Sequence, residues 1–298
     1  MVRRGNYKFL DKFSWYVPGF RGMFILLLWL LAGAVVGSVL TIILTAALGL
    51  ETGAIYGTLI SYPVMFIPPM IYAGVKSGAL SMEYSGVKLD SNNFSPLGGI
   101  LCALLAVVMT IASGFCTEPL VSLLPPMPDF LKEALTNLTT GNIWLNFLMV
   151  SIFAPIFEEW LCRGMVLRGL LANKIRPAVA IPVSALFFAV IHLNPWQALP
   201  AFIMGCLFGY VYYKTGSLKL TMLMHFANNT LALVVGHIDS LKDMESWQEV
   251  IPSPTYWILV AAFALLTVLC VLAFRKIALS KPEGNLDAVP SIFDSDEV

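Results

Sequence analysis

The feature that most constrains this chain is a series of apolar stretches, each about as long as a helix that crosses a membrane. Crossing the hydrocarbon core of a bilayer takes roughly 20 apolar residues in helical form. We predict eight spans, at residues 23–48, 54–75, 97–117, 143–171, 177–193, 197–213, 218–236 and 255–274. The alternating segments of about ten residues that are typical of a membrane β-barrel are absent from the sequence. The sequence therefore predicts an all-α, polytopic membrane protein.

The composition supports this class. Of the 298 residues, 58% are hydrophobic and only 12% are charged. A soluble domain of this length has no need for so much apolar surface. The formal net charge is zero, so the chain lacks the basic excess of a nucleic-acid-binding protein. We expect the lipid bilayer as a partner and no nucleic acid.

The positive charges predict how the spans are oriented. With both termini in the cytosol, all of the 18 lysines and arginines except Lys132 and Lys242 fall on the cytosolic side. An excess of lysine and arginine in cytosolic loops is the usual signature of membrane orientation. The distribution therefore predicts an even number of spans and two cytosolic termini.

Several polar side chains lie inside the predicted spans. The stretch "SIFAPIFEEWLCRG" (151–164) carries two adjacent carboxylates and an arginine in an otherwise apolar run. A charged side chain at bilayer depth costs on the order of 2.5 kcal/mol or more, so it usually marks function or a paired partner. The full polar set comes from three spans and consists of Glu158, Glu159, Arg163, His192, His225, Asn228 and Asn229.

A structural explanation is available for most of these residues taken singly. Glu159 and Arg163 are spaced i,i+4 and can neutralise each other on one helix face. His192 can end its span at the interface, and an asparagine such as Asn229 can form hydrogen bonds between helices. Glu158 fits less well, because it points about 100° away from Glu159 around the helix. Its partner must come from another span, and the two histidines are the candidates.

Such a set could hydrolyse an amide bond. A carboxylate inside a helix bundle can act as a general base towards water, and histidine and asparagine donors can stabilise the oxyanion of a tetrahedral intermediate. Alternatively, Glu158, His192 and His225 are ligand types of a catalytic zinc site, although the usual HExxH helix is missing. Pro155 precedes the two acids, removes a backbone donor and leaves a carbonyl without its helical partner.

Three motifs carry a family resemblance, and they occur in order along residues 143–236. The motifs are EExxxR at Glu158, Glu159 and Arg163, FxxxH at Phe188 and His192, and HxxxN at His225 and Asn229. In this order and spacing they resemble the CPBP family, which comprises the CAAX-protease and bacteriocin-processing (Abi) intramembrane proteases. The resemblance covers neither the first hundred residues nor the last span.

The resemblance implies an eight-helix membrane endopeptidase with a polar cavity that faces the cytosol. Glu158 matches the glutamate that activates water, and His192 matches the residue that helps to bind this water. His225 and Asn229 match the pair proposed to hold the oxyanion. The remaining motif residues, Glu159, Arg163 and Phe188, match supporting positions. No cofactor is expected under this mechanism, and zinc is the alternative.

The predicted spans suggest an organisation, and the resemblance implies a substrate class and a location. Residues 1–142 would hold N-terminal helices and loops, residues 143–236 the catalytic core, and residues 237–298 an outer loop, the last helix and an acidic cytosolic tail. The expected partner is a membrane-tethered peptide or protein, which is cut near its C-terminus. The expected location is the cytoplasmic membrane of a bacterium.

Two other functions are compatible with the same motifs. A non-catalytic scaffold or immunity protein could keep the family fold. A proton-coupled transporter could use Glu158 as a relay, but a transporter typically has paired repeats with broken helices in both halves. The polar residues here lie only in the fourth, fifth and seventh predicted spans, which counts against a transporter.

The predicted depths of the site residues raise a geometric question. At 1.5 Å per residue, Glu158 and His192 each lie about 24 Å from the cytosolic edge, and His225 lies only about 9 Å from Lys219. The three can meet only if the turn at 214–219 dips inward from that edge or the span 218–236 is tilted.

Overall fold

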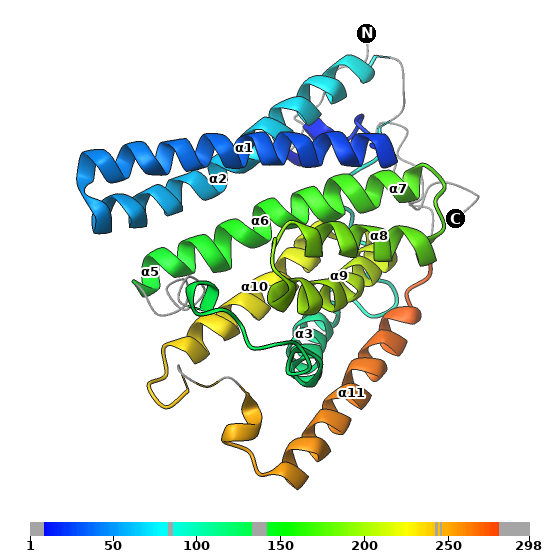
Figure 1. Cartoon of the computed structure of the whole chain (residues 1–298). Helices are drawn as coiled ribbons and strands as arrows, with labels where there is room; N and C mark the ends of the chain where they lie inside the picture. Colours follow the sequence, from blue (N-terminus) through cyan, green and yellow to red (C-terminus); the bar gives the residue numbers. More distant parts are fainter. Residues whose placement is uncertain (1–8, 83–85, 133–141, 242–243, 245, 280–298) are drawn as a thin grey trace. The chain divides into compact units, whose positions relative to one another are not determined.

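The computed structural model describes residues 9–82, 86–132, 142–241, 244 and 246–279 (Figure 1). Every regular element within these ranges is a helix, so the all-α prediction is confirmed for this part of the chain. From residue 280 onwards, the predicted acidic tail lies outside the described residues.

The chain forms two compact units. The N-terminal unit contains residues up to 91 together with 163–176, and the central unit contains residues 92–162 and 177–279. One continuous helix, Ile143–Ala172, passes from the central unit into the N-terminal unit. The three-part division expected from the sequence stays a prediction.

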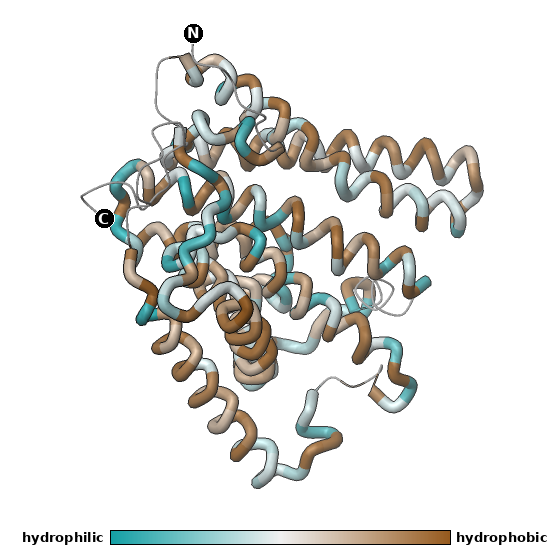
Figure 2. Tube along the Cα trace, turned by 180° about the vertical axis from the view of Figure 1, so that it is seen from behind, coloured by the Kyte–Doolittle hydropathy of each residue, from teal (hydrophilic) through white to brown (hydrophobic). Residues whose placement is uncertain are grey.

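Among the residues that the structure describes, six helices are long and apolar enough to cross a membrane. They are α1 (Phe20–Leu48), α2 (Leu50–Leu80), α3 (Gly99–Val121), the continuous helix Ile143–Ala172, α10 (Leu218–Gly236) and α11 (Ser253–Arg275). Apolar residues run along much of α11, as Figure 2 shows. Two further helices, α8 (Pro177–Val190) and α9 (Pro195–Thr215), fill the remaining predicted spans but are not among the six. The described residues therefore contain candidate membrane-spanning helices, whereas eight spans and two cytosolic termini stay predictions.

In the N-terminal unit, α1 and α2 form a tightly packed antiparallel hairpin (Figure 1). Gly49 makes the turn with a φ of 88°, which glycine adopts without strain. The helices approach so closely that a Cβ on Gly33 would lie 2.1 Å from the Met65 carbonyl oxygen. Small residues recur every four positions on both helices, a pattern that lets membrane helices pack backbone to backbone. The facing pairs lie symmetrically about the turn and are Gly33–Met65, Gly37–Ser61, Thr41–Gly57 and Thr45–Gly53.

A buried arginine holds the remaining segments of the N-terminal unit together. Arg168 opens the short helix α7 (Arg168–Ala172) and is fully buried. Its guanidinium group donates to backbone carbonyls from three separate stretches of the unit, which gives it several polar partners inside the protein. The accepting carbonyls belong to Phe13, Ser14, Tyr16, Val87 and Gly164.

Two π-helical stretches interrupt the continuous helix on either side of the two acids. Along the chain it comprises α5 (Ile143–Asn146), η2 (Phe147–Phe153), α6 (Ala154–Glu159), η3 (Trp160–Leu167) and α7. In η2 and η3 the backbone bonds reach back five residues instead of four, as in the bond from the Ala154 N–H to the Met149 carbonyl. Such widened turns inside α-helices are frequent at functional sites.

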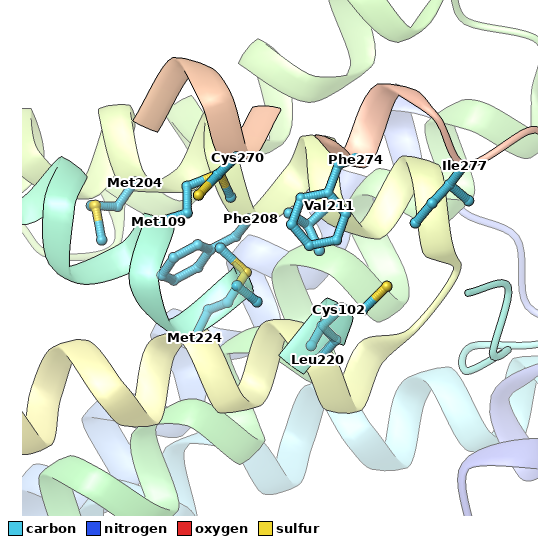
Figure 3. Close-up of a cluster of buried hydrophobic side chains, with 11 residues drawn as sticks. Cys102, Met109, Met204, Phe208, Val211, Leu220, Met224, Cys270, Phe274 and Ile277 are labelled. Carbon is cyan, nitrogen blue, oxygen red and sulfur yellow. The ribbon is translucent and has the colours of Figure 1, made fainter. Parts of the chain in front are cut away.

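The core of the central unit brings four helices together (Figure 3). It combines residues of α3, α9, α10 and α11, all of them almost completely inaccessible to solvent. The cluster contains Cys102, Ala106, Met109, Met204, Phe208, Val211, Leu220, Met224, Cys270, Phe274 and Ile277. Because Met224 precedes His225 directly, this packing determines which way the next face of α10 points.

The turn between α9 and α10 is buried in the central unit. Gly216 ends α9 in a left-handed conformation with a φ of 63°, and the Ser217 side chain caps the start of α10. Asn93 covers this turn, because its backbone N–H donates to the Thr215 carbonyl and its side chain to the Lys214 carbonyl. A tight turn was predicted here and is confirmed. Which of the two conditions brings His225 to the depth of the two acids stays open to test.

Candidate active site

The structure brings His225 between the two adjacent glutamates. The imidazole Nδ1 lies 3.1 Å from Oε1 of Glu159, and its Nε2 lies 3.8 Å from Oε2 of Glu158. The acids come from α6 and the histidine from α10. Glu158 thus has a partner from another span, and that partner is one of the two predicted histidines.

The hydrogen bond to Glu159 fixes the orientation of the His225 ring. When Glu159 is ionised, its oxygen can only accept, so the ring nitrogen Nδ1 carries the proton and donates it. The other nitrogen, Nε2, therefore faces Glu158. A separation of 3.8 Å is too long for a hydrogen bond. One oxygen atom can nevertheless lie within about 2.8 Å of both Nε2 and the Glu158 carboxylate.

The two glutamates differ in exposure. Glu159 is 0% exposed, His225 is 5% exposed and Glu158 is 9% exposed. Glu158 is therefore the acid with residual access, while Glu159 lies wholly inside the protein against the imidazole. Neighbouring carboxylates in different surroundings commonly take different chemical roles.

Two phenylalanine rings enclose the His225 imidazole. The ring of Phe188, from α8, meets it edge-on at 5.5 Å between centroids. The ring of Phe208, from α9, lies 6.0 Å away in a tilted arrangement. Phe188 is part of the predicted FxxxH motif, whereas Phe208 was missed. Phe208 sits in an apolar stretch without any polar marker, so no signal in the sequence could have singled it out.

His192 lies in the turn that follows α8. Its Nδ1 is 2.8 Å from the Phe188 carbonyl, and because a carbonyl accepts, this nitrogen donates and Nε2 is left with its lone pair when the ring is neutral. The Phe188 ring also contacts the His192 ring edge-on at 4.9 Å. Asn194 fixes the backbone by donating to the His192 carbonyl. Phe188 thus contacts both histidine rings and links His192 to the site.

Asn229 is held by backbone on a neighbouring helix. Its side-chain nitrogen donates to the Val150 carbonyl at 2.8 Å, and its side-chain oxygen accepts from Asn228 at 3.1 Å. The amide nitrogen carries two N–H groups, and the Val150 carbonyl takes one of them. Asn229 follows His225 by one helical turn on α10.

The last predicted residue of the EExxxR motif, Arg163, is fully buried in η3. The i,i+4 pairing of Arg163 with Glu159 that the sequence suggests stays a prediction. A further contact was missed: the Ser184 hydroxyl of α8 donates to the Cys162 carbonyl at 2.8 Å. This bond fastens α8 to the helix that carries the two acids.

The zinc alternative requires three suitable side chains close together. Within the described ranges, no group of three or more histidine, cysteine, aspartate or glutamate side chains is placed to hold a metal ion. The zinc alternative with Glu158, His192 and His225 stays a prediction.

Comparison with known families decides the affiliation of this segment. Residues 140–231 match the sequence model of a family described as Rce1-like, type II CAAX prenyl endopeptidases. Residues 140–231 are therefore similar to the Rce1-like family. No curated protein and no solved structure matches the chain.

The Rce1-like segment covers the whole candidate site. It begins just before α5 and ends within α10, and it includes all seven residues predicted from the three motifs. The predicted CAAX-protease affiliation is therefore confirmed. Together with the apolar helices, this similarity indicates an integral, multi-pass membrane protein.

Proposed function

We propose that this protein is an intramembrane endopeptidase that hydrolyses a peptide bond near the C-terminus of a membrane-associated peptide or protein. The observation that carries the proposal is the line of side chains Glu159, His225 and Glu158 inside the Rce1-like segment. A buried imidazole oriented by one carboxylate and facing a second, more exposed carboxylate fits general acid–base chemistry on water.

In the proposed mechanism Glu158 is the general base, because it is the carboxylate with residual access. Its carboxylate takes a proton from water, and the resulting hydroxide attacks the carbonyl carbon of the scissile peptide bond. His192 helps to hold this water through Nε2, the ring nitrogen that the Phe188 carbonyl does not bind.

The tetrahedral intermediate carries a negative oxygen that needs hydrogen-bond donors. We assign this task to Nε2–H of His225, in the doubly protonated ring, and to the second N–H group of Asn229. Collapse of the intermediate breaks the C–N bond, and the proton held by Glu158 passes to the leaving amine nitrogen. Glu159 orients the His225 ring, and Arg163 and Phe188 support the arrangement.

The family description suggests the substrate class. Type II CAAX prenyl endopeptidases point to a peptide with a C-terminal CAAX sequence that is anchored in the membrane. We propose that such a membrane-tethered peptide or protein is the partner, that no cofactor takes part, and that the protein resides in a bacterial cytoplasmic membrane. The charge distribution of the sequence supports the orientation with both termini in the cytosol.

The decisive experiment compares the wild type with Glu158→Gln, both purified in detergent. Cleavage of a panel of quenched fluorescent peptides, including a prenylated CAAX mimic, is followed with and without a strong chelator. We expect the wild type to cleave at least one peptide in the presence of chelator, and Glu158→Gln to cleave none.

Other outcomes separate the alternatives. Cleavage that is lost on chelation and restored by zinc would keep the protease but replace its mechanism. Cleavage that survives in Glu158→Gln would exclude Glu158 as the base. If the wild type cleaves no peptide, and cells carrying Glu158→Gln keep the wild-type phenotype, the protein is a non-catalytic scaffold of the same fold.

A further inference from the structure

The helix that carries the two glutamates has a gap in its backbone bonding one turn before them. In η2 the N–H groups bond to carbonyls five residues back, and the last bond of this kind runs from Ala154 to Met149. The next donor in the same pattern would be residue 155, and its acceptor would be the Val150 carbonyl. Residue 155 is a proline and has no N–H group. The Val150 carbonyl thus lacks the donor that this pattern would give it.

Asn229 supplies the missing donor from another helix. Its side-chain N–H reaches the Val150 carbonyl at 2.8 Å, a normal length for this bond. Pro155 is buried, and the bond between Asn229 and Val150 is partly buried. A buried carbonyl without a partner costs free energy, and inside a membrane protein such carbonyls are typically satisfied by side chains of neighbouring helices.

This bond lies next to the chemistry. Asn229 stands four residues after His225 on α10, and Val150 stands eight residues before Glu158 on the acid-bearing helix. A hydrogen bond between them fixes the position of α10 along its axis and its rotation about that axis, relative to η2 and α6. Displacing either helix by about 1 Å would spoil the approach of Nε2 of His225 to the Glu158 carboxylate, and misplacements of that size can cost about 100-fold in rate.

We propose that Asn229 is a positioning residue, which sets the geometry between His225 and Glu158. It does so by donating a hydrogen bond to the Val150 carbonyl, to which Pro155 has no N–H to donate. The inference rests on the proposed function, and it adds a second task to the one assigned to Asn229 above. The proposal implies that Asn229 is needed because residue 155 is a proline.

The test restores the missing backbone donor. In Pro155→Ala, residue 155 regains an N–H group that can bond to the Val150 carbonyl, so the need for Asn229 should fall. Four proteins are compared: the wild type, Asn229→Leu, Pro155→Ala, and the double variant with both changes. For each one, the thermal unfolding temperature in detergent and the kcat and KM for a cleaved peptide are measured.

A matched control uses a second proline in the same unit. Pro182 lies inside α8 and also removes a helical donor, but it has no relation to Val150. The variant that combines Pro182→Ala with Asn229→Leu should therefore behave like Asn229→Leu alone. This control separates a specific repair at Val150 from a general gain in helix stability.

We expect Asn229→Leu to lower kcat strongly with little change in KM, and to lower the unfolding temperature. In the double variant, kcat should recover at least about tenfold over Asn229→Leu, which corresponds to about 1.4 kcal/mol, within the usual cost of a buried unsatisfied carbonyl. Its unfolding temperature should return to that of Pro155→Ala.

Two results would overturn the proposal. One is a double variant that is no more active than Asn229→Leu, which would mean that the amide acts on the substrate alone. The other is equal rescue by Pro182→Ala. The unfolding temperatures test the bond at Val150 even if no peptide is cleaved, so failure of this inference and failure of the proposed function can be told apart.

Discussion

Glu158 and Glu159 show how neighbouring residues of the same type acquire different tasks. Glu159 is fully buried and accepts a hydrogen bond from His225, whereas Glu158 keeps some exposure and lies beyond hydrogen-bond distance of the same ring. Hydrogen bonds to a charged group are roughly twice as strong as neutral ones. The buried acid is therefore suited to holding the histidine, and the more exposed acid to reacting with water.

This division of tasks predicts unequal effects of the same substitution. In Glu159→Gln the amide oxygen can still accept from Nδ1 of His225, but the negative charge that balances a doubly protonated ring is lost. We expect kcat to fall on the order of 100-fold with KM nearly unchanged, while Glu158→Gln loses cleavage altogether. The measurement is the steady-state kinetics of both variants on one peptide.

A matched control is Glu51→Gln, because Glu51 is an exposed acid at the start of α2. It should leave kcat unchanged. A loss of activity in Glu159→Gln as complete as that in Glu158→Gln would contradict the division of tasks between the two acids.

At the scale of single elements, the α1–α2 hairpin depends on close approach of two backbones. The distance that decides this is the 2.1 Å between a Cβ built on Gly33 and the Met65 carbonyl oxygen. The obstructing atom belongs to backbone, so it cannot move aside as a flexible side chain would. A side chain at residue 33 must therefore push the two helices apart.

We predict that Gly33→Ala destabilises the N-terminal unit by about 1–3 kcal/mol, the usual cost of overpacking. Gly78→Ala is the matched control, because a Cβ at that position meets no atom within 4 Å. It should leave the hairpin stable or stabilise it slightly, since alanine favours helix more than glycine does. Thermal unfolding in detergent measures both effects. Equal stability of Gly33→Ala and wild type would show that the hairpin is not closely packed at this pair.

For the whole molecule, the sequence was sufficient to predict the features that depend on residue type and on the spacing of residues along the chain. All eight predicted spans form helices, because apolar runs of this length leave the backbone no other way to satisfy its polar groups in lipid. The order of the three motifs was also sufficient to predict the family that residues 140–231 resemble.

Features that depend on contacts between distant segments could not be predicted. The π-helical turns beside the two acids, the packing of Phe208 on His225 and the bond from Asn229 to Val150 arise only once several helices are in place. Arg168 is a further example. The sequence assigned its charge to the cytosolic side, but not its burial among backbone carbonyls of the N-terminal unit.

The number of spans depends on whether α8 and α9 cross the whole membrane. Within the central unit, Trp196 at the start of α9 donates its indole N–H to the Pro125 carbonyl at 2.8 Å. Pro125 follows α3, one of the helices long enough to span. The turn between α8 and α9 therefore lies at the same end of the central unit as the end of α3. This favours eight spans, with the turn on the outer side.

This arrangement can be tested by labelling single cysteines in intact cells, after the five native cysteines have been replaced. Leu193, in the turn between α8 and α9, is 80% exposed, and so is Leu123 after α3. We predict that a thiol reagent that cannot cross membranes labels Leu193→Cys and Leu123→Cys from outside, whereas Lys276→Cys reacts only after the membrane is opened. If Leu193→Cys instead behaves like Lys276→Cys, then α8 and α9 enter and leave the membrane on the cytosolic side, and only six helices span it.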